Sequence, residues 1–199
     1  MHPDQFTIIN SPKSDVVQRS TSELLYHAQV LDLLRTDMTA KIQVHIGGAY
    51  GDKESAKSNF VKNFLLLDKK IQRRLVIEND DTLFSVRDCL DVSSKTRVPV
   101  LFDNFHDMLN GSGMDLSDIL QAVRNTWKAK DGIPMVDYSS QERGKRPGTH
   151  VQSIDLTDFK RFLKDSQPGD FDVMLEIKDK ETSAIQALQA ARNDPRTQK

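Results

Sequence analysis

The chain has 199 residues, of which 37% are hydrophobic, and its 28 Lys and Arg against 29 Asp and Glu leave a net charge of −1. This length predicts one domain with a buried core, and the charge excludes a nucleic-acid binder that relies on bulk basicity. The single cysteine, Cys89, excludes an intrachain disulfide framework and a Cys-based zinc site. With neither a run of roughly 20 apolar residues nor a secretory signal pattern, we expect no membrane attachment and a cytoplasmic protein.

Five short apolar runs alternate with helical patterns along the chain. A helical pattern at 16–34 comes first. The runs then follow at 41–45, 74–78, 98–103, 133–137 and 172–176, and their length and β-branched content are typical of buried parallel strands. Helical patterns follow them at about 60–67, 84–95, 115–129, 155–166 and 180–192. The sequence therefore predicts one helix and five consecutive βα units.

Each run ends on a side chain that can bind a metal ion. The carboxyl ends of parallel strands lie on one edge, and only a barrel brings them to one point. We therefore expect an α/β fold of the TIM (β/α)8 kind. Because such a barrel typically takes about 250 residues and eight strands, residues 1–199 are expected to form one partial catalytic domain. It would contain the last five βα units and lack the three N-terminal strands.

The candidate metal ligands are histidines and carboxylates at strand ends and in loops. They are His2, His45, Glu78, Asp103, His106, Asp137, His150 and Glu176. Without cations, such a cluster would repel itself and lose hydration at high cost. The ligand types suit Mn²⁺, Zn²⁺ or Fe²⁺ rather than Ca²⁺, and eight ligands imply two or three ions. Ions about 3.5–4 Å apart are a device for phosphodiester hydrolysis.

Other polar segments flank these ligands. Asp80 and Asp81 could accept hydrogen bonds from ligand histidines, or they could be solvated loop carboxylates. The glycine-rich turn at 45–51 matches neither a dinucleotide-binding nor a phosphate-loop motif. The loop at 141–150 has a mobile composition and could clamp a polyanionic backbone, although a solvated loop is the alternative. Cations that could contact phosphates are Arg143, Lys145, Arg146 and Lys178.

Several motifs resemble the UV damage endonuclease family of DNA-repair enzymes. The match extends over nearly the whole chain and is carried by segments that occur in the family's order. They are His2–Phe6, Asn10–Pro12, His45–Gly48, Gly51–Lys53, Glu78–Asp81, Asp103 with His106, Tyr138–Ser140 and Asp172–Lys180.

This resemblance implies a TIM barrel related to endonuclease IV and xylose isomerase, with up to three divalent ions, usually Mn²⁺. It implies nicking of DNA immediately 5′ of pyrimidine dimers, 6-4 photoproducts and some abasic sites. The eight ligands named above fall on the family's metal positions, and Gln5 and Phe6 fall on the pair that wedges into the duplex. We expect Glu78, Asp103, Glu176 and Lys178 to be catalytic. We expect Gln5, Phe6, Asn10, Arg143, Lys145 and Arg146 to contact DNA.

The chain departs from the family pattern in three places. Phe6 stands where a tyrosine is common, which keeps a ring for stacking without the hydroxyl. Met135 stands where family members carry a lysine that can be carboxylated, and Asp137 replaces a histidine. Asp137 can still bind a metal ion. The third departure is the absence of the three strands that precede His2 in family chains.

Three hypotheses follow. The leading one is a metal-dependent endonuclease that acts on UV-damaged double-stranded DNA, with Mn²⁺ as the expected cofactor and no obligate protein partner. The second is a sugar isomerase or epimerase of the related barrels, although Gln5, Phe6 and the basic loop speak against a small substrate. The third is an inactive truncated remnant, because five strands cannot close an eight-stranded barrel.

Overall fold

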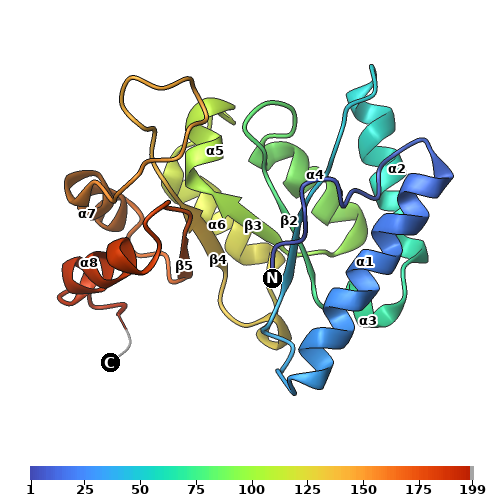
Figure 1. Ribbon diagram of the computed structural model, residues 1–199, viewed down its shortest axis with the longest axis horizontal. Helices are drawn as coiled ribbons and strands as arrows, with labels where there is room; N and C mark the ends of the chain where they lie inside the picture. Colours follow the sequence, from blue (N-terminus) through green and yellow to red (C-terminus); the bar gives the residue numbers. More distant parts are fainter. Residues whose placement is uncertain (198–199) are drawn as a thin grey trace.

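A computed structural model of the protein describes residues 1–197 (Figure 1). Helix α1 (Ser14–Leu33) precedes five βα units. The strands are β1 (Ile42–His45), β2 (Leu75–Glu78), β3 (Val100–Asp103), β4 (Met135–Tyr138) and β5 (Asp172–Leu175). The helices between and after them are α2 (Lys53–Leu66), α3 (Lys69–Gln72), α4 (Val86–Thr96), α5 (Asn104–Leu109), α6 (Leu116–Thr126), α7 (Leu156–Asp165) and α8 (Glu181–Ala191), and a short 3₁₀ turn covers Ala129–Asp131.

The five strands form one parallel sheet in the order β1-β2-β3-β4-β5. Strands β1 to β4 are almost completely buried and consist mainly of Val, Leu, Ile and Phe, as expected for a sheet covered by helices. The larger helices lie along the outside of the sheet, and α2, α4 and α6 pack successively against one another (Figure 1). The predicted parallel α/β fold is therefore confirmed.

The sheet curls, so that side chains from non-adjacent strands meet on its inner face. In a flat sheet with strands about 4.8 Å apart, β1 and β4 would be separated by about 14 Å. Instead, Gln43 on β1 donates a hydrogen bond to Asp137 on β4. Nearer the amino ends of the strands, Lys41 Nζ reaches Asp131 Oδ1 at 2.6 Å. The curl brings side chains from non-adjacent strands together, and this geometry makes a shared polar site possible.

The predicted strands lie where the apolar runs placed them, within about two residues. The short helices α3 and α5 were not predicted, because four and six residues are too few to show helical periodicity. Helix α5 follows β3 directly, and the Asp103 side chain caps it by accepting the His106 N–H at 2.7 Å. Among residues 1–197, every helix is too short or too polar to cross a membrane.

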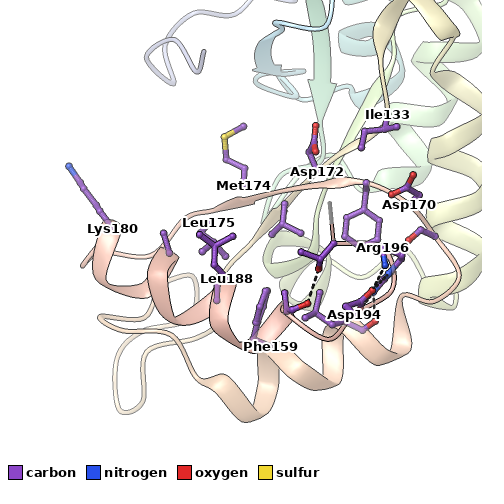
Figure 2. A pocket seen from close by; sticks show the side chains of 18 residues that line it. Ile133, Phe159, Asp170, Asp172, Met174, Leu175, Lys180, Leu188, Asp194 and Arg196 are labelled. Atoms are coloured by element: carbon purple, nitrogen blue, oxygen red, sulfur yellow. Dashed lines mark hydrogen bonds and ion pairs between the residues drawn. The ribbon is translucent and has the colours of Figure 1, made fainter. Parts of the chain in front are cut away.

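A mostly apolar cavity of about 660 Å³ lies between β5 and the helices α7 and α8 (Figure 2). Phe159, Leu163 and Leu188 form part of its wall, and the Arg196 guanidinium stacks over the Phe171 ring at 5.4 Å. Its described lining includes none of the predicted ligands or DNA contacts. The cavity is therefore separate from the polar site at the carboxyl ends of the strands.

Arg74 secures the connection between α1 and β1. Its side chain is 1% exposed and donates to the Asp32 carboxylate at 2.8 Å. It also donates to the backbone carbonyls of Thr36, Asp37 and Ala40. One guanidinium therefore bonds an acceptor on each of four residues in the 32–40 segment. Because Arg74 immediately precedes β2, these bonds hold the end of α1 against the start of that strand.

Replacing Arg74 by Met should lower the free energy of unfolding by about 3 kcal/mol, because the Asp32 carboxylate and three backbone carbonyls lose a charged donor that is itself buried. Urea unfolding measures this change. The matched control is Arg73→Met, since Arg73 is exposed and, among residues 1–197, its side chain donates only to the Lys69 carbonyl. This variant should change stability by less than about 0.5 kcal/mol. Equal losses in the two variants would contradict the role of Arg74.

Candidate metal centre

The candidate ligands gather at the carboxyl edge of the sheet, where each strand ends. The strand register pairs His45 with Glu78, and Asp103 with Asp137. Glu176 comes directly after β5, and its N–H bonds the Tyr138 carbonyl at 3.0 Å. Backbone pairing therefore sets these groups at similar heights along the strands, and the curl turns them towards one another.

Three overlapping groups of side chains could each hold a metal ion. In each group the ligand atoms lie within 4.8 Å of one another, and neighbouring groups share a carboxylate. The groups are His2–His45–Glu78, Glu78–Asp103–His106 and Asp103–Asp137–Glu176. Seven of the eight predicted ligands therefore belong to one continuous cluster. The eighth, His150, lies beside it, with Nδ1 3.9 Å from Glu176 Oε2.

Backbone carbonyls orient three of the four histidines. Nδ1 of His2 lies 2.8 Å from the Pro3 oxygen, Nδ1 of His106 lies 3.0 Å from the Asn79 oxygen, and Nδ1 of His150 lies 2.9 Å from the Glu176 oxygen. A carbonyl only accepts, so in a neutral imidazole this contact selects the tautomer with its proton on Nδ1. Nε2 of that tautomer is then free to bind a metal ion.

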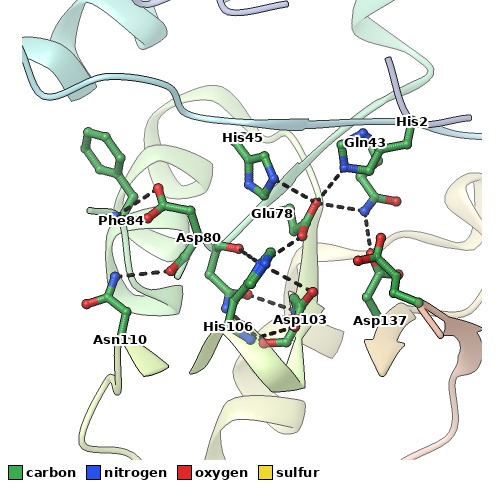
Figure 3. Close-up of polar contacts among 12 residues, drawn as sticks. His2, Gln43, His45, Glu78, Asp80, Phe84, Asp103, His106, Asn110 and Asp137 are labelled. Atoms are coloured by element: carbon green, nitrogen blue, oxygen red, sulfur yellow. Dashed lines mark hydrogen bonds and ion pairs between the residues drawn. The ribbon is translucent and has the colours of Figure 1, made fainter. Parts of the chain in front are cut away.

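Within the Glu78–Asp81 segment, Asp80 does not accept a hydrogen bond from a ligand histidine, as the sequence had suggested it could (Figure 3). Asp80 accepts from the N–H groups of Thr82 and Phe84, so it shapes the turn and orients no histidine. Buried Asn79 takes that role through its carbonyl. Its side chain also exchanges two 2.9 Å hydrogen bonds with the backbone of Asp103. Asn79 therefore joins β2 to β3 at the level of the cluster.

Burial and mutual charge shift the pKa values of the cluster. Burial raises the pKa of Asp103 to about 8 and that of Asp137 well above its ordinary value. Burial also opposes ionisation of Glu78, yet the adjacent histidines hold its pKa below the ordinary value. The hydrogen bond with Glu78 raises the pKa of His2 to about 9. Although burial lowers the pKa of His106, contacts with Glu78 and Asp103 raise it to about 10.

The unpaired atoms of the cluster fit a bound metal. Within the described part of the chain, four buried cluster atoms have no hydrogen-bond partner: His45 Nδ1, Glu78 Oε1, Asp103 Oδ2 and Asp137 Oδ1. His106 Nδ1 approaches two of these oxygens at 3.2 and 3.3 Å, but its proton is directed to the Asn79 carbonyl. Buried polar atoms normally have partners. Nitrogen and carboxylate donors without thiolate match Mn²⁺, Zn²⁺ or Fe²⁺.

Gln43 belongs to the site but is not the last residue of its strand, so looking for metal-binding side chains at strand ends does not find it. It lies two residues before His45, on the same face of β1, and is 3% exposed. Its Nε2 donates to Glu78 Oε2 at 2.7 Å and to Asp137 Oδ2 (Figure 3). The signal in the sequence is one polar residue inside an otherwise apolar strand, in phase with the terminal ligand.

The predicted DNA contacts near the start of the chain are divided between surface and interior. Gln5 and Phe6 occupy the tip of a tight turn closed by a 2.8 Å bond from the Thr7 N–H to the Asp4 carbonyl, and Phe6 is 76% exposed. Asn10, in contrast, is completely buried and donates to the Gly48 carbonyl at 2.7 Å. Asn10 is therefore not a surface contact in this structure. It joins the segment that bears Phe6 to the turn after β1.

The basic loop is anchored rather than free, contrary to its mobile composition. An antiparallel bridge joins Gln141 to His150, and the Gln141 side chain bonds the Arg146 carbonyl and the Gly148 N–H, both at 2.9 Å. The cations of the loop and of the segment after β5 are exposed. They are Arg143, Lys145, Arg146 and Lys178. Among residues 1–197, Lys178 forms no ion pair, so its ammonium is available to a ligand.

The fold and site together define an α/β protein with a histidine–carboxylate cluster of the kind that binds divalent metal ions at the carboxyl edge of a parallel sheet. The family model described as UV-endonuclease UvdE matches residues 1–195. The chain belongs to the UV-endonuclease UvdE family. The predicted family is confirmed.

Individual relatives agree with this assignment. The UV DNA damage endonuclease of Clostridium perfringens (strain 13 / Type A) is 43% identical over 99% of this chain. That of Bacillus cereus (strain Q1) is 34% identical over 94% of it. The crystal structure of SacUVDE superposes with a TM-score of 0.91 at 44% identity, covering 96% of this chain and 64% of that one. The chain spans 48% and 60% of the lengths of the two sequence relatives.

A more distant structure shares the fold alone. D-psicose 3-epimerase from Clostridium cellulolyticum H10, solved with D-tagatose, has a TM-score of 0.60 at 14% identity. The match covers 96% of this chain and 74% of the epimerase chain. At this identity the likeness concerns backbone architecture and carries no functional argument.

The pKa shifts predict how pH affects the stability of the metal-free protein. Asp103, with a folded pKa of about 8, keeps its proton where the unfolded chain has lost it, so folding becomes less favourable as pH rises. His2 and His106 stabilise the fold fully below pH about 6.5, and this contribution is lost as pH rises towards 9 and 10. Both effects have the same sign.

In EDTA, the free energy of unfolding should therefore fall on the order of 3 kcal/mol from pH 5 to pH 9, after allowing for solvent screening at the partly exposed His2. Urea unfolding at several pH values measures it. Saturating Mn²⁺ should reduce the fall, because a metal ion binds the ionised carboxylates and neutral imidazoles. Constant or increasing stability over this range in EDTA would show that the cluster does not titrate as described.

Proposed function

We propose that the protein is a metal-dependent DNA-repair endonuclease that nicks DNA 5′ of UV photoproducts, including pyrimidine dimers and 6-4 photoproducts. The observation that carries the proposal is the continuous cluster of three overlapping ligand groups in a chain whose family is UV-endonuclease UvdE. The substrate is UV-damaged double-stranded DNA. The names of the relatives from Clostridium perfringens and Bacillus cereus support this substrate.

The proposed cofactor is two or three divalent ions, with Mn²⁺ preferred. Such ions would supply charge stabilisation to the phosphodiester oxygens during hydrolysis. The residues that would hold them are His2, His45, Glu78, Asp103, His106, Asp137, His150 and Glu176. Glu78 and Asp103 are each common to two of the ligand groups, so each would contribute to more than one of the proposed sites. Glu176 supplies a carboxylate at the end of the cluster nearest the basic loop.

The DNA would be held by exposed groups around this edge. Lys178 is placed beside Glu176 and would neutralise a backbone phosphate, while Arg143, Lys145 and Arg146 would contact phosphates farther along the strand. The exposed Phe6 ring would replace the stacking that a displaced lesion gives up, and Gln5 would occupy the space opposite. Asn10 would support this wedge from beneath through its bond to Gly48.

The architecture that best accommodates the site is an eight-stranded barrel of the endonuclease IV and xylose isomerase kind. The proposal is that residues 1–199 are one partial catalytic domain, containing five of the eight βα units. Its support is the sequential parallel order of the strands, the curl that brings β1 to β4, and the epimerase likeness. The apolar cavity beside β5 also supports it (Figure 2), since a neighbouring unit would cover such a surface.

The function is tested by Mn²⁺-dependent nicking of supercoiled plasmid. The chain should convert UV-irradiated plasmid to the open circle in Mn²⁺ and lose this activity in EDTA. Glu176→Gln should reduce the rate at least about 100-fold, because an amide is a poor replacement for a carboxylate ligand. The matched control is Glu181→Gln, an exposed change in α8 that leaves the cluster intact and should keep the full rate.

Two results would overturn the proposal. Equal nicking of irradiated and unirradiated plasmid would remove the specificity for damage. Isomerisation of a ketose by the purified protein, with no nicking and no affinity for duplex DNA, would favour a sugar isomerase instead.

A further inference from the structure

Gln43 lies on the inner face of β1 and contacts two carboxylates of the cluster, one on β2 and one on β4. Its amide nitrogen lies 2.7 Å from Glu78 Oε2 on β2 and also bonds Asp137 Oδ2 on β4. Figure 3 shows the amide between the two acids. The adjacent histidines keep Glu78 ionised, and an ionised carboxylate only accepts hydrogen bonds, so the nitrogen rather than the oxygen of the amide must face Glu78. The two N–H groups of one nitrogen are then fully used.

The amide occupies one oxygen of each acid and leaves the other free. The remaining atoms, Glu78 Oε1 and Asp137 Oδ1, are buried and without hydrogen-bond partners among the described residues. Glu78 is a member of two ligand groups, and Asp137 belongs to the group with Asp103 and Glu176. His2 and His45 approach Oε2 of Glu78, whereas His106 approaches Oε1. The bond from Gln43 therefore fixes the rotation of the carboxylate that presents each oxygen to its ligand group.

The amide cannot replace a metal ion, because it carries no charge. Two buried carboxylates held to one neutral donor still repel each other, and desolvation still penalises their ionised forms. What Gln43 can supply is orientation. Its own position is restrained, since it is 3% exposed on a paired strand and its backbone N–H donates to the Met1 carbonyl at 2.9 Å.

We propose that Gln43 is a positioning residue that sets the orientation of Glu78 and Asp137 for divalent metal binding, by donating one N–H to each. This role rests on the proposed metal-dependent function. Gln43 would orient two of the carboxylates, as the backbone carbonyls orient the histidines. Hydrogen bonds that orient metal ligands typically contribute 10- to 100-fold to metal affinity.

The test is Mn²⁺ binding to EDTA-treated protein, measured by isothermal titration calorimetry as a dissociation constant and a stoichiometry. Gln43→Met keeps the length of the side chain and removes both donors, so Mn²⁺ should bind about 10- to 100-fold more weakly. The control is Gln18→Met, an exposed change on α1 that should leave the dissociation constant unchanged. Gln43→Thr suits a strand and cannot reach either acid, so it provides a second variant if the first does not fold.

A double-mutant cycle separates positioning from a general packing role. Asp137→Asn should weaken Mn²⁺ binding strongly in the wild-type background and much less when combined with Gln43→Met, because the two residues act through one contact. Additive effects would overturn the proposal, as would wild-type affinity in both Gln43 variants. If the wild-type chain itself binds no Mn²⁺, the proposed function fails first, and that outcome is distinct from normal binding by the Gln43 variants.

Discussion

Three carboxylates buried close together are the constraint on which the rest of the structure depends. Glu78, Asp103 and Asp137 are each completely buried, and ligand atoms of Asp103 lie within 4.8 Å of those of both other acids. Removing such charges from water is costly, and their mutual repulsion adds to the cost. Cations can compensate for both effects, and the adjacent histidines and bound metal ions are two such sources of positive charge.

The scaffold around the acids leaves little freedom to their ligand atoms. The strand register sets the heights of the side chains, the curl turns them inward, and Asn79 joins the ends of β2 and β3. Backbone carbonyls fix the imidazoles of His2, His106 and His150. An ordered site of this kind would bind metal ions without rearrangement of its ligands, and a curled parallel sheet supplies it because side chains from several strands meet at one edge.

Much of this arrangement could be predicted from the sequence, because apolar runs identify buried strands and their ends identify the polar edge. Glu78 and Asp103 were found in this way. The six-residue helix α5 was missed, since too few residues carry a periodic pattern. Gln43 was missed because a single polar residue within a strand indicates its importance only when its partners are known. The burial of Asn10 depends on a contact with Gly48 across 38 positions, which local patterns cannot reveal.

If the proposed function is correct, these acids form a metal centre rather than a network of protonated side chains. Crystals of the chain grown with Mn²⁺, with anomalous diffraction recorded above and below the manganese absorption edge, test it most directly. We expect two or three manganese peaks along the cluster, with Glu78 and Asp103 each beside two of them. A map without a peak in the cluster, or with manganese bound only at exposed carboxylates elsewhere, would contradict it.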